Sequence, residues 1–542
     1  MPKSDSRKRA RDSALHARWD ATPAEHFERI GLSRERIKTA QVGLQGHIVA
    51  PGDPTYDADR RLKNPVFDAS PSLIVFCMAV TDVRIALALA GESGMPFTVR
   101  SGGHCTAGFS AGFGVLIDVS GLASITVDAA HQKATVGTGC TFTQLNATLE
   151  TYGLHVPGGE CDDVCIGGFV QGGGLGFTSV TYGMNCDSVL EMQVMLYDGS
   201  IVVANQNQNY DLWWAMRGGT GGNFGVLLSV TYQLYPLTAC SGWALAWPLS
   251  PSAVAAATEV LMLLQANYMR DSSYAPNLNL QVLLVYQTII DPTQPPLPEP
   301  VPVFMVRGLW VGDPSNGAAA MQPLQQIEGC VTQWSGTDTY RNVLDKLLNY
   351  PQEQPLTVHK PYEGKGSRYV ARDLTADEWT SLLNYYLSTP NNLSYMYLEF
   401  YGGAINSYPR GQSAFIHRDT VFNAVLDVFW YYAEDQLKAE DFLNGWIKLI
   451  ETMWNGEAYQ NYPSINIADY ASSYWADAVW GLAQAKQKYD PINAFRFVQE
   501  VREPNIPPVG PVTPLPPQLA AALAQPIDYT GGAPPGARVS VQ

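Results

Sequence analysis

The stretch that decides the fold runs from residue 99 to residue 176 and contains two glycine-rich turns. The first turn reads Arg-Ser-Gly-Gly-His at residues 100–104. The second begins with Gly-Gly-Glu-Cys at 158–161 and ends with Gly-Gly-Gly-Leu-Gly at 172–176. Because glycine has no Cβ, such turns let backbone N–H groups approach an anionic ligand closely. Each turn also carries one reactive side chain, His104 or Cys161, so the stretch predicts a phosphate-bearing cofactor attached at two points.

The residues before the first turn predict a strand, a helix and a second strand. An apolar run at 72–77 is typical of a buried strand, and apolar residues at helical spacing follow between 80 and 90. A second strand at 96–99 leads directly into the first turn. This order and length predict a βαβ unit whose second strand positions His104. A third glycine-rich turn at 218–225 offers another site of close backbone approach.

Length and composition limit the classes of protein to consider. A chain of 542 residues is too long for one core and predicts two or three domains. Its net charge of −16 disfavours nucleic acid and anionic membrane surfaces as partners, since both would repel it. Eight cysteines are too sparse for a disulfide framework.

The two ends of the chain differ from its middle. Residues 1–20 are basic without an apolar run, so we predict a disordered N-terminus and no secretory signal. Residues 73–90 are interrupted by Asp82 and Arg84 and do not predict a membrane span. We therefore expect a cytoplasmic protein. Residues 504–542 are rich in proline and predict an extended tail, which covers either the body or the partner subunit of a homo-oligomer.

The second half of the chain predicts a different architecture, because glycine becomes rarer after residue 237. Residues 277–282 alternate polar and apolar, as in a half-exposed antiparallel strand. Two other segments, 302–311 and 394–401, resemble them. The predicted helices are 254–269, 317–329, 375–387 and 420–437. Together these segments predict an antiparallel sheet covered by helices.

Two common nucleotide-binding motifs are excluded by inspection. No Gly-x-Gly-x-x-Gly sequence is present, because Gly172 and Gly174 are followed by Phe177 in the third position. No Gly-x-x-x-x-Gly-Lys-[Ser/Thr] loop is present either. A standard dinucleotide fold and a phosphate-loop enzyme are therefore disfavoured.

What the chain resembles is the vanillyl-alcohol-oxidase flavoprotein superfamily, specifically its berberine-bridge-enzyme-like branch. The resemblance covers residues 64–500 and rests on the two glycine turns, on Asp-Leu-Trp-Trp-Ala at 211–215 and on Tyr-Asp-Pro-Ile-Asn-Ala-Phe at 489–495. It implies a two-domain α+β fold. We expect an FAD-binding domain at 21–237 and 476–503, and a substrate-binding domain with a helix-covered antiparallel sheet at 238–475.

The resemblance also implies bicovalent FAD. His104 matches the family histidine that bonds to the flavin 8α-methyl, and Cys161 matches the cysteine that bonds to flavin C6. Imidazole and thiolate are the nucleophiles able to add to an electron-poor isoalloxazine. The expected cofactor-binding residues are His104, Cys161, Arg100, Ser101, Gly102, Gly103, Gly108, Val164, Gly167, Gly168, Gly172, Gly173, Gly174, Gly176, Gly225, Tyr459 and Asn461.

Two residues are candidates for proton transfer. Tyr462 follows Asn461 as in the family segment whose tyrosine deprotonates the substrate. An ordinary tyrosine is a poor base at neutral pH, so it needs a neighbouring carboxylate. Glu399 lies on a strand that resembles one lining the family's cleft, and is the expected partner. The alternatives are aromatic core packing for Tyr462 and a solvated strand carboxylate for Glu399.

The predicted reaction is the oxidation of an alcohol by hydride transfer to FAD, with O2 reduced to H2O2. Val164 stands where the family uses valine to leave an oxygen pocket, whereas Thr106 departs from the tyrosine of several saccharide oxidases. A carbohydrate or oligosaccharide is the leading substrate. Aromatic residues that can stack on sugar rings are Trp310, Tyr397, Tyr401 and Tyr408. The alternatives are tailoring oxidation of a polyketide, alkaloid or phenolic alcohol, and a flavin-binding protein without turnover.

Other interpretations of the same residues remain open. Cys161 and Cys165 with His155 resemble half of a zinc site, but no second ligand pair follows at zinc spacing, so no metal is predicted. Cys161 can also be a buried thiol, with FAD attached through His104 alone. Cys165 is interpreted as a small buried residue, and His417 with Arg418 as structural.

Overall fold

The computed structural model of the protein describes residues 17–161, 163–269, 273–274, 277–287, 300–349, 360–502 and 515–529. Most of both predicted tails, residues 1–16, 503–514 and 530–542, lies outside the described residues. Residues 17–20 are helical and Trp19 is fully buried, so the ordered chain begins before residue 21, where we had placed it.

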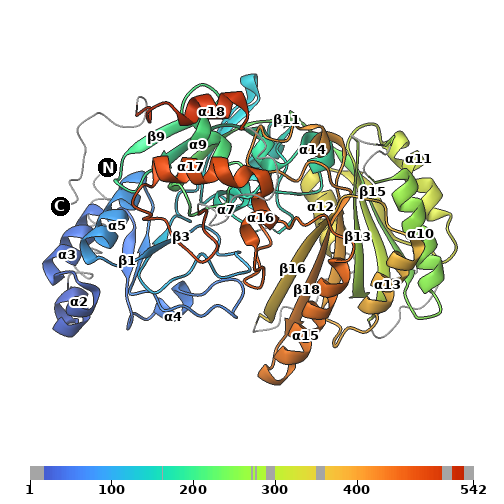
Figure 1. Ribbon diagram of the computed structural model, residues 1–542, viewed down its shortest axis with the longest axis horizontal. Coiled ribbons are helices and arrows are strands. Elements are labelled where there is room, and N and C mark those ends of the chain that lie inside the picture. The colour runs from blue at the N-terminus through green and yellow to red at the C-terminus, as the bar shows by residue number, and fades with distance from the viewer. Residues whose placement is uncertain are drawn as a thin grey trace.

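One end of the molecule is built on a small sheet (Figure 1). Its strands lie in the order β1 (His47–Val49), β2 (Leu73–Phe76), β4 (Val115–Asp118) and β3 (Phe97–Arg100). The last three are parallel to one another, and β1 is antiparallel to β2. Helix α5 (Val80–Ser93) connects β2 to β3, as the βαβ prediction requires, and β4 lies between these two strands. Helices α2 (Ala24–Ile30) and α3 (Arg34–Gly43) pack beside α5.

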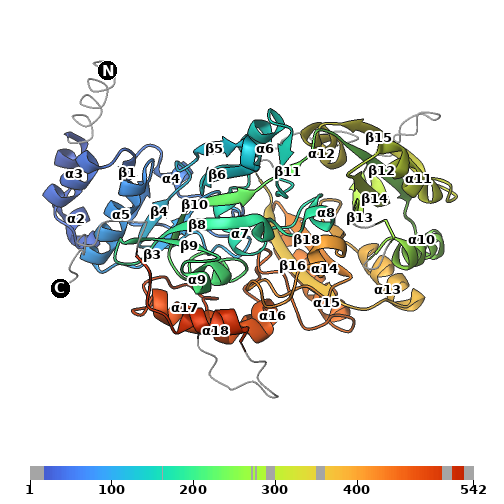
Figure 2. The same ribbon diagram turned by 90° about the horizontal axis from the view of Figure 1, so that it is seen from above.

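A five-stranded antiparallel sheet forms the middle of the molecule (Figure 2). Its strands lie in the order β5 (Ile125–Asp128), β6 (Lys133–Gly137), β10 (Val226–Gln233), β8 (Val189–Met195) and β9 (Ile201–Asn205). The helices that pack with it are α6 (Phe142–Glu150), α7 (Ile166–Gln171) and α9 (Tyr210–Ala215). Their buried apolar faces share one core with strands β6, β8 and β10.

A seven-stranded antiparallel sheet forms the other end. Its strands lie in the order β15 (Val331–Asp338), β12 (Cys240–Pro248), β14 (Val301–Trp310), β13 (Leu278–Gln287), β17 (Tyr395–Phe400), β18 (Phe422–Trp430) and β16 (Tyr362–Val370). One face is covered by helices α10 (Val254–Asn267), α11 (Pro314–Gln325), α13 (Ala376–Tyr386) and α15 (Ala433–Ile450). The predicted α+β class with a helix-covered antiparallel sheet is confirmed, whereas the exact domain boundaries stay predictions.

Two predictions about this sheet are wrong. Residues 420–437 were expected to form one helix, but they form strand β18 and the start of α15. Both faces of β18 are buried, and the second face mixes Asn423 and Asp427 with apolar residues, so the run lacks the strict alternation of a half-exposed strand. Residues 277–282 were expected to form a half-exposed strand, yet Asn279 and Gln281 are 3% and 5% exposed. Their polar face meets the rest of the protein instead of solvent.

The C-terminal segments return to the middle sheet. Helices α17 (Val479–Tyr489) and α18 (Pro517–Leu523) lie against α9 in both views. Leu519 is fully buried there, and Asn209 exchanges hydrogen bonds with the backbone of Asp528 at 2.8 and 2.9 Å. The described part of the predicted extended tail is thus partly helical and docked on the body. No helix among the described residues is long and apolar enough to cross a membrane.

Candidate active site

A cavity of about 1080 Å³ is lined by residues of the first two sheets on one side and of the seven-stranded sheet on the other. Typical small-molecule sites have volumes of roughly 300–1,000 Å³, so this cavity is large enough for a sizeable cofactor together with a substrate. His104, Cys161 and Tyr462 all line it. Three residues predicted from separate parts of the sequence therefore open onto the same space.

The first glycine turn brings His104 to the cavity from the end of β3. Arg100, the last residue of that strand, is fixed by a buried ion pair with Asp118 at 2.7 Å. Gly103 has φ +70°, a conformation that glycine adopts without strain. His104 Nε2 lies 2.8 Å from Asp163 Oδ1, and Lys63 pairs with the same carboxylate. Burial lowers the pKa of His104 despite the opposing effect of Asp163, which favours the neutral, nucleophilic imidazole.

The second turn brings Cys161 to the same space. Its side chain is exposed to the cavity, and Val164 lines the cavity next to it. Burial, followed by the nearby charge of Glu160, raises the pKa of the Cys161 thiol to about 11. The thiolate is the reactive form, so attack by Cys161 on a ligand requires loss of its proton in an environment that opposes this loss.

Gly167 and Gly168 of helix α7 show why the second turn is rich in glycine. A Cβ on Gly167 would lie 2.1 Å from Thr138 Oγ1, so this glycine permits close packing of α7. A Cβ on Gly168 would meet no atom within 4 Å and would enter the cavity. Gly168 therefore widens the cavity itself.

The structure separates the predicted cofactor-binding residues into two groups. Those that line the cavity are Ser101, Gly102, Gly103, His104, Cys161, Val164, Gly167, Gly168, Gly225, Tyr459 and Asn461. Those that lie behind its wall are Arg100, Gly108, Gly172, Gly173, Gly174 and Gly176. The second group has a packing role: a Cβ on Gly176 would lie 1.8 Å from the carbonyl oxygen of Gly158, and one on Gly172 would lie 2.0 Å from Asn461 Oδ1.

Tyr462 and Glu399 form a hydrogen-bonded pair on the opposite wall. The Tyr462 hydroxyl donates to Glu399 Oε1 at 2.7 Å, and Asn423 Nδ2 donates to the other carboxylate oxygen at 2.8 Å. Burial, followed by the charge of Glu160, raises the pKa of Glu399 to about 8. Burial and Glu399 also raise the pKa of Tyr462 well above its usual value. The pair can accept a proton from a ligand at the tyrosine and store one at the carboxylate.

Lys365 places a positive charge beside this pair. Its Nζ lies 4.5 Å from the centroid of the Tyr462 ring and donates to Asp427 at 2.8 Å and to Tyr397 at 3.2 Å. Burial opposes its charge, but Asp427 and Glu363 outweigh this effect and raise the pKa of Lys365. Lys365 therefore stays protonated and stabilises negative charge that develops on Tyr462.

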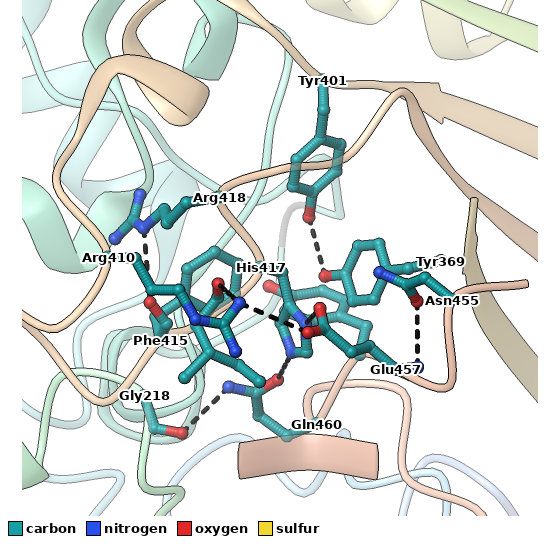
Figure 3. Close-up of polar contacts among 12 residues, drawn as sticks. Gly218, Tyr369, Tyr401, Arg410, Phe415, His417, Arg418, Asn455, Glu457 and Gln460 are labelled. Atoms are coloured by element: carbon teal, nitrogen blue, oxygen red, sulfur yellow. Dashed lines mark hydrogen bonds and ion pairs between the residues drawn. The ribbon is translucent and has the colours of Figure 1, made fainter. Parts of the chain in front are cut away.

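A buried polar cluster holds the segment that carries Tyr462 (Figure 3). His417 is fully buried, with Nδ1 2.8 Å from Glu457 Oε2 and Nε2 2.9 Å from Gln460 Oε1. The Gln460 amide donates in turn to the carbonyl of Gly218 at 2.9 Å. Arg410 also pairs with Glu457, at 3.3 Å. These bonds tie both sides of Tyr459 to the rest of the structure.

Tyr459 and Asn461 connect that segment to the glycine-rich wall. The hydroxyl oxygen of Tyr459 accepts hydrogen bonds from the backbone N–H groups of Gly174 and Leu175 at 2.9 and 3.2 Å. The Asn461 amide donates to the carbonyl of Phe169 at 2.9 Å. The two walls are thus locked together immediately beside Tyr462, which fixes the position of its hydroxyl relative to both turns.

The residues of the glycine-rich wall fit FAD. Glycine turns expose backbone for a pyrophosphate, Gly168 leaves space where a side chain would intrude, and an imidazole and a thiol open onto the same cavity. The half zinc site considered above is not assembled, because His155 Nε2 contacts Thr178 Oγ1 at 2.8 Å. No group of three potential metal ligands occurs within the described ranges.

Comparisons with known proteins agree with this geometry. The FAD binding domain family matches residues 71–205, and the berberine and berberine-like family matches residues 458–502. The chain therefore contains the FAD-binding and berberine-like family domains, and its structural neighbours are berberine-bridge-enzyme-like flavoproteins. It is an FAD-linked oxidoreductase.

Relatives in bacteria, fungi and plants span nearly the whole fold. YgaK, an uncharacterised FAD-linked oxidoreductase of Bacillus subtilis, is 25% identical over 84% of this chain and 97% of its own length. Xylooligosaccharide oxidase of Thermothelomyces thermophilus is 24% identical over 89% of this chain and 96% of its own length. The structure of Physcomitrella patens BBE-like 1 superimposes with a TM-score of 0.75, at 22% identity, over 86% of this chain and 98% of that one.

The structure corrects the predicted aromatic surface. Tyr397 lines the cavity, but Trp310, Tyr401 and Tyr408 do not. Trp310 packs in the core beneath the covering helices, Tyr401 bonds to Tyr369 and Tyr408 bonds to Arg217. The polar cavity residues that were not predicted include Glu160, Gln281, Arg307 and Lys365. The polar alternation at 277–282 was the one available signal for Gln281, and it was assigned to solvent.

Proposed function

We propose that this flavoprotein is an oxidase that oxidises an alcohol group, with a carbohydrate or oligosaccharide hydroxyl as the leading substrate. The observation that carries the proposal is the hydrogen bond of 2.7 Å between Tyr462 and Glu399 at the wall of a cavity that His104 and Cys161 also line. When bound, FAD supplies the acceptor for a hydride from the substrate carbon and passes the two electrons to O2.

The proton of the substrate hydroxyl goes to Tyr462 Oη, while the tyrosine passes its own proton to Glu399 Oε1. This transfer needs Glu399 in its ionised form, which its raised pKa makes a basic acceptor. Asn423 holds the carboxylate by its second oxygen, so Oε1 stays aligned with the tyrosine. Lys365, whose ammonium lies over the ring of Tyr462, stabilises negative charge on the phenol oxygen during this transfer.

Further parts of the proposal concern the cofactor and its reoxidation. We propose that His104 and Cys161 both bond covalently to FAD. The two bonds would hold the cofactor in a wide cavity, in which Gly168 has no side chain to cover it. Val164 lines the cavity next to Cys161, and its small side chain supports access of O2. A cytoplasmic location and a small-molecule partner are part of the same proposal.

Carbohydrate is preferred as substrate because the cavity wall combines aromatic and polar side chains. Tyr395 and Tyr397 lie 5.8 Å apart by ring centroids, beside Phe429. Charged and amide groups occupy the neighbouring positions. One curated relative is named for oxidation of a xylooligosaccharide, which supports the same class.

The test is a panel of sugars and aromatic alcohols offered to the purified holoprotein under anaerobic conditions. We expect a mono- or oligosaccharide to bleach the flavin absorbance, and to release H2O2 when air is admitted. Bleaching by aromatic alcohols alone would favour natural-product oxidation. A flavin that no alcohol reduces would contradict the proposal and favour a protein without turnover.

A further inference from the structure

A row of four polar side chains crosses the seven-stranded sheet, and the two at one end of it, Arg307 and Gln281, line the cavity. Arg307 on β14 is paired with Gln281 on β13, Gln281 with Glu399 on β17, and Glu399 with Asn423 on β18. Residues paired in this way project from the same face of a sheet. Arg307 and Gln281 therefore extend the row that contains the proton acceptor Glu399.

Arg307 stands out because its charge is buried without a hydrogen-bond partner. Its side chain lies at the cavity wall, the residue is 8% exposed, and its Nε has no partner. Within the described chain, no group accepts a hydrogen bond from this guanidinium or pairs with it. Burial accordingly lowers the pKa of Arg307 to about 10, although Glu160 opposes this effect.

Two other buried arginines of this chain each have a carboxylate partner. Arg100 pairs with Asp118 at 2.7 Å, and Arg418 binds both oxygens of Asp187 at 2.8 and 2.6 Å. A buried guanidinium without acceptors is costly, because desolvation is not repaid by hydrogen bonds. The Arg307 guanidinium is therefore positioned to donate hydrogen bonds to a bound ligand.

Gln281 and Glu160 accompany Arg307 at the cavity wall. The Oε1 atom of Gln281 is buried without a partner, while its amide nitrogen donates to Glu160 Oε1 at a long 3.3 Å. Glu160 also lines the cavity and influences Arg307 electrostatically without forming an ion pair with it. Arg307 donates hydrogen bonds, Glu160 accepts them, and the Gln281 amide can do both.

We propose that Arg307, Gln281 and Glu160 bind two neighbouring hydroxyl groups of the substrate, so that the enzyme selects a polyhydroxylated ring. This inference rests on the proposed function and names the residues that impose its substrate class. A hydroxyl accepts a hydrogen bond from Arg307 and at the same time donates one to Glu160 or Gln281. A simple aromatic alcohol would leave all three side chains unpaired.

The surrounding charges favour hydroxyls over a carboxylate. A carboxylate would pair with Arg307, but it would face Glu160 directly and lie on a wall that also carries Glu363 and Asp427. Neighbouring strands are about 4.8 Å apart, so Arg307 lies roughly 10 Å from Glu399 along the row. The bound diol would therefore lie at one end of the ring or chain whose other end is oxidised at Tyr462.

The experiment compares the holoprotein with Arg307→Met and with the matched control Arg341→Met. Arg341 also lines the cavity, but it is 44% exposed and pairs with Glu150. We expect Arg307→Met to raise KM for the best sugar by about 10- to 100-fold, since a hydrogen bond to a charged group is lost, with a much smaller change in kcat. Arg341→Met should change KM by less than about threefold, as expected for an exposed pair.

Two further readouts exclude a merely structural effect. Arg307→Met should retain its flavin and melt at the same or a higher temperature, because it removes an unpaired buried charge. A deoxy analogue lacking the hydroxyl bound by Arg307 should bind the parent protein weakly and lose nothing further in Arg307→Met. If the methionine variant does not fold, Gln281→Leu is used in the same way.

Sugar binding, followed by perturbation of the flavin spectrum, separates this inference from the proposed function. Binding of saccharides that is lost in Arg307→Met, without oxidation of any alcohol, would support the diol site and contradict the proposed function. Oxidation of sugars or aromatic alcohols with an unchanged KM in Arg307→Met would overturn the diol site alone. A preference for carboxylate-bearing alcohols would overturn it too, and absence of both binding and oxidation would overturn both.

Discussion

The two walls of the cavity differ in the kinds of groups that they present. The wall from the first two sheets presents backbone and small residues, with His104 and Cys161 as its reactive side chains. The wall from the seven-stranded sheet presents long polar side chains such as Arg307, Gln281 and Lys365. The first wall can hold a cofactor through its shape, whereas the second acts on a substrate through charge and hydrogen bonds. Cofactor retention and turnover should therefore respond to different substitutions.

The largest expected effect is on the second wall. Tyr462→Phe removes the hydroxyl that takes the substrate proton and should lower the rate of flavin reduction by about 10²- to 10⁴-fold. Flavin content should stay unchanged, because the phenylalanine keeps the ring contacts with Tyr459. Stopped-flow bleaching at saturating substrate measures the rate. Normal turnover in this variant would show that Tyr462 is not the base.

Substitution of Glu399 should change how the rate of flavin reduction depends on pH. Below a pH of about 8, Glu399 carries its own proton and cannot accept one from Tyr462. The rate of flavin reduction should thus fall about tenfold for each pH unit below that value in the parent protein. Glu399→Gln should be slower and lose this dependence between pH 5 and 9. An unchanged pH profile in the variant would remove Glu399 from the proton path.

The support behind the second wall should affect stability more than chemistry. His417→Leu leaves Glu457 Oε2 and Gln460 Oε1 without the imidazole, at a cost of about 1–3 kcal/mol for each buried partner left unpaired. We expect a lower melting temperature and a smaller kcat, with KM and the pH profile little changed. A variant as stable as the parent would show that the cluster of Figure 3 does not hold this segment.

The smallest effect separates the first wall from the second. Gly168→Ala places a methyl group in the cavity, whereas Gly91→Ala places one on the exposed face of α5; neither Cβ meets an atom within 4 Å. Both changes should stabilise the apoprotein by about 0.5–1 kcal/mol, since alanine favours a helix. Only Gly168→Ala should lower flavin occupancy, measured by the absorbance ratio of flavin to protein. Equal occupancy in both variants would place the cofactor elsewhere.

The same contrast explains what the sequence reveals. The glycine-rich wall is local, because each turn supplies its residues from one short segment, 100–104 or 158–176. The motifs around His104 and Cys161 are therefore visible in the chain. Even there, Gly172 and Gly176 look like ligand contacts, but Gly172 packs against the Asn461 side chain and Gly176 against the backbone of Gly158. A missing Cβ has the same appearance in sequence whether a ligand or the protein itself approaches it.

The polar wall depends on strand register and is largely hidden from sequence. Arg307, Gln281 and Glu399 come from three strands whose alignment only tertiary structure defines. Most of the predicted helix at 420–437 is strand β18, which supplies Asp427 to this wall and Asn423 to Glu399. Polar alternation at 277–282 was visible, but its polar side chains do not face bulk solvent: Gln281 lines the cavity, and Asn279 bonds to Val180 and Thr181. Glu399 was found through the family resemblance and not through its spacing.

Attachment of one FAD through both turns is tested by acid denaturation of the purified protein, followed by separation of the polypeptide from free flavin. We expect the yellow colour to stay with the polypeptide in the parent, in His104→Ala and in Cys161→Ala. It should be lost only in the double variant. Colour that leaves the parent polypeptide, or that stays with the double variant, would contradict attachment of one FAD through both turns.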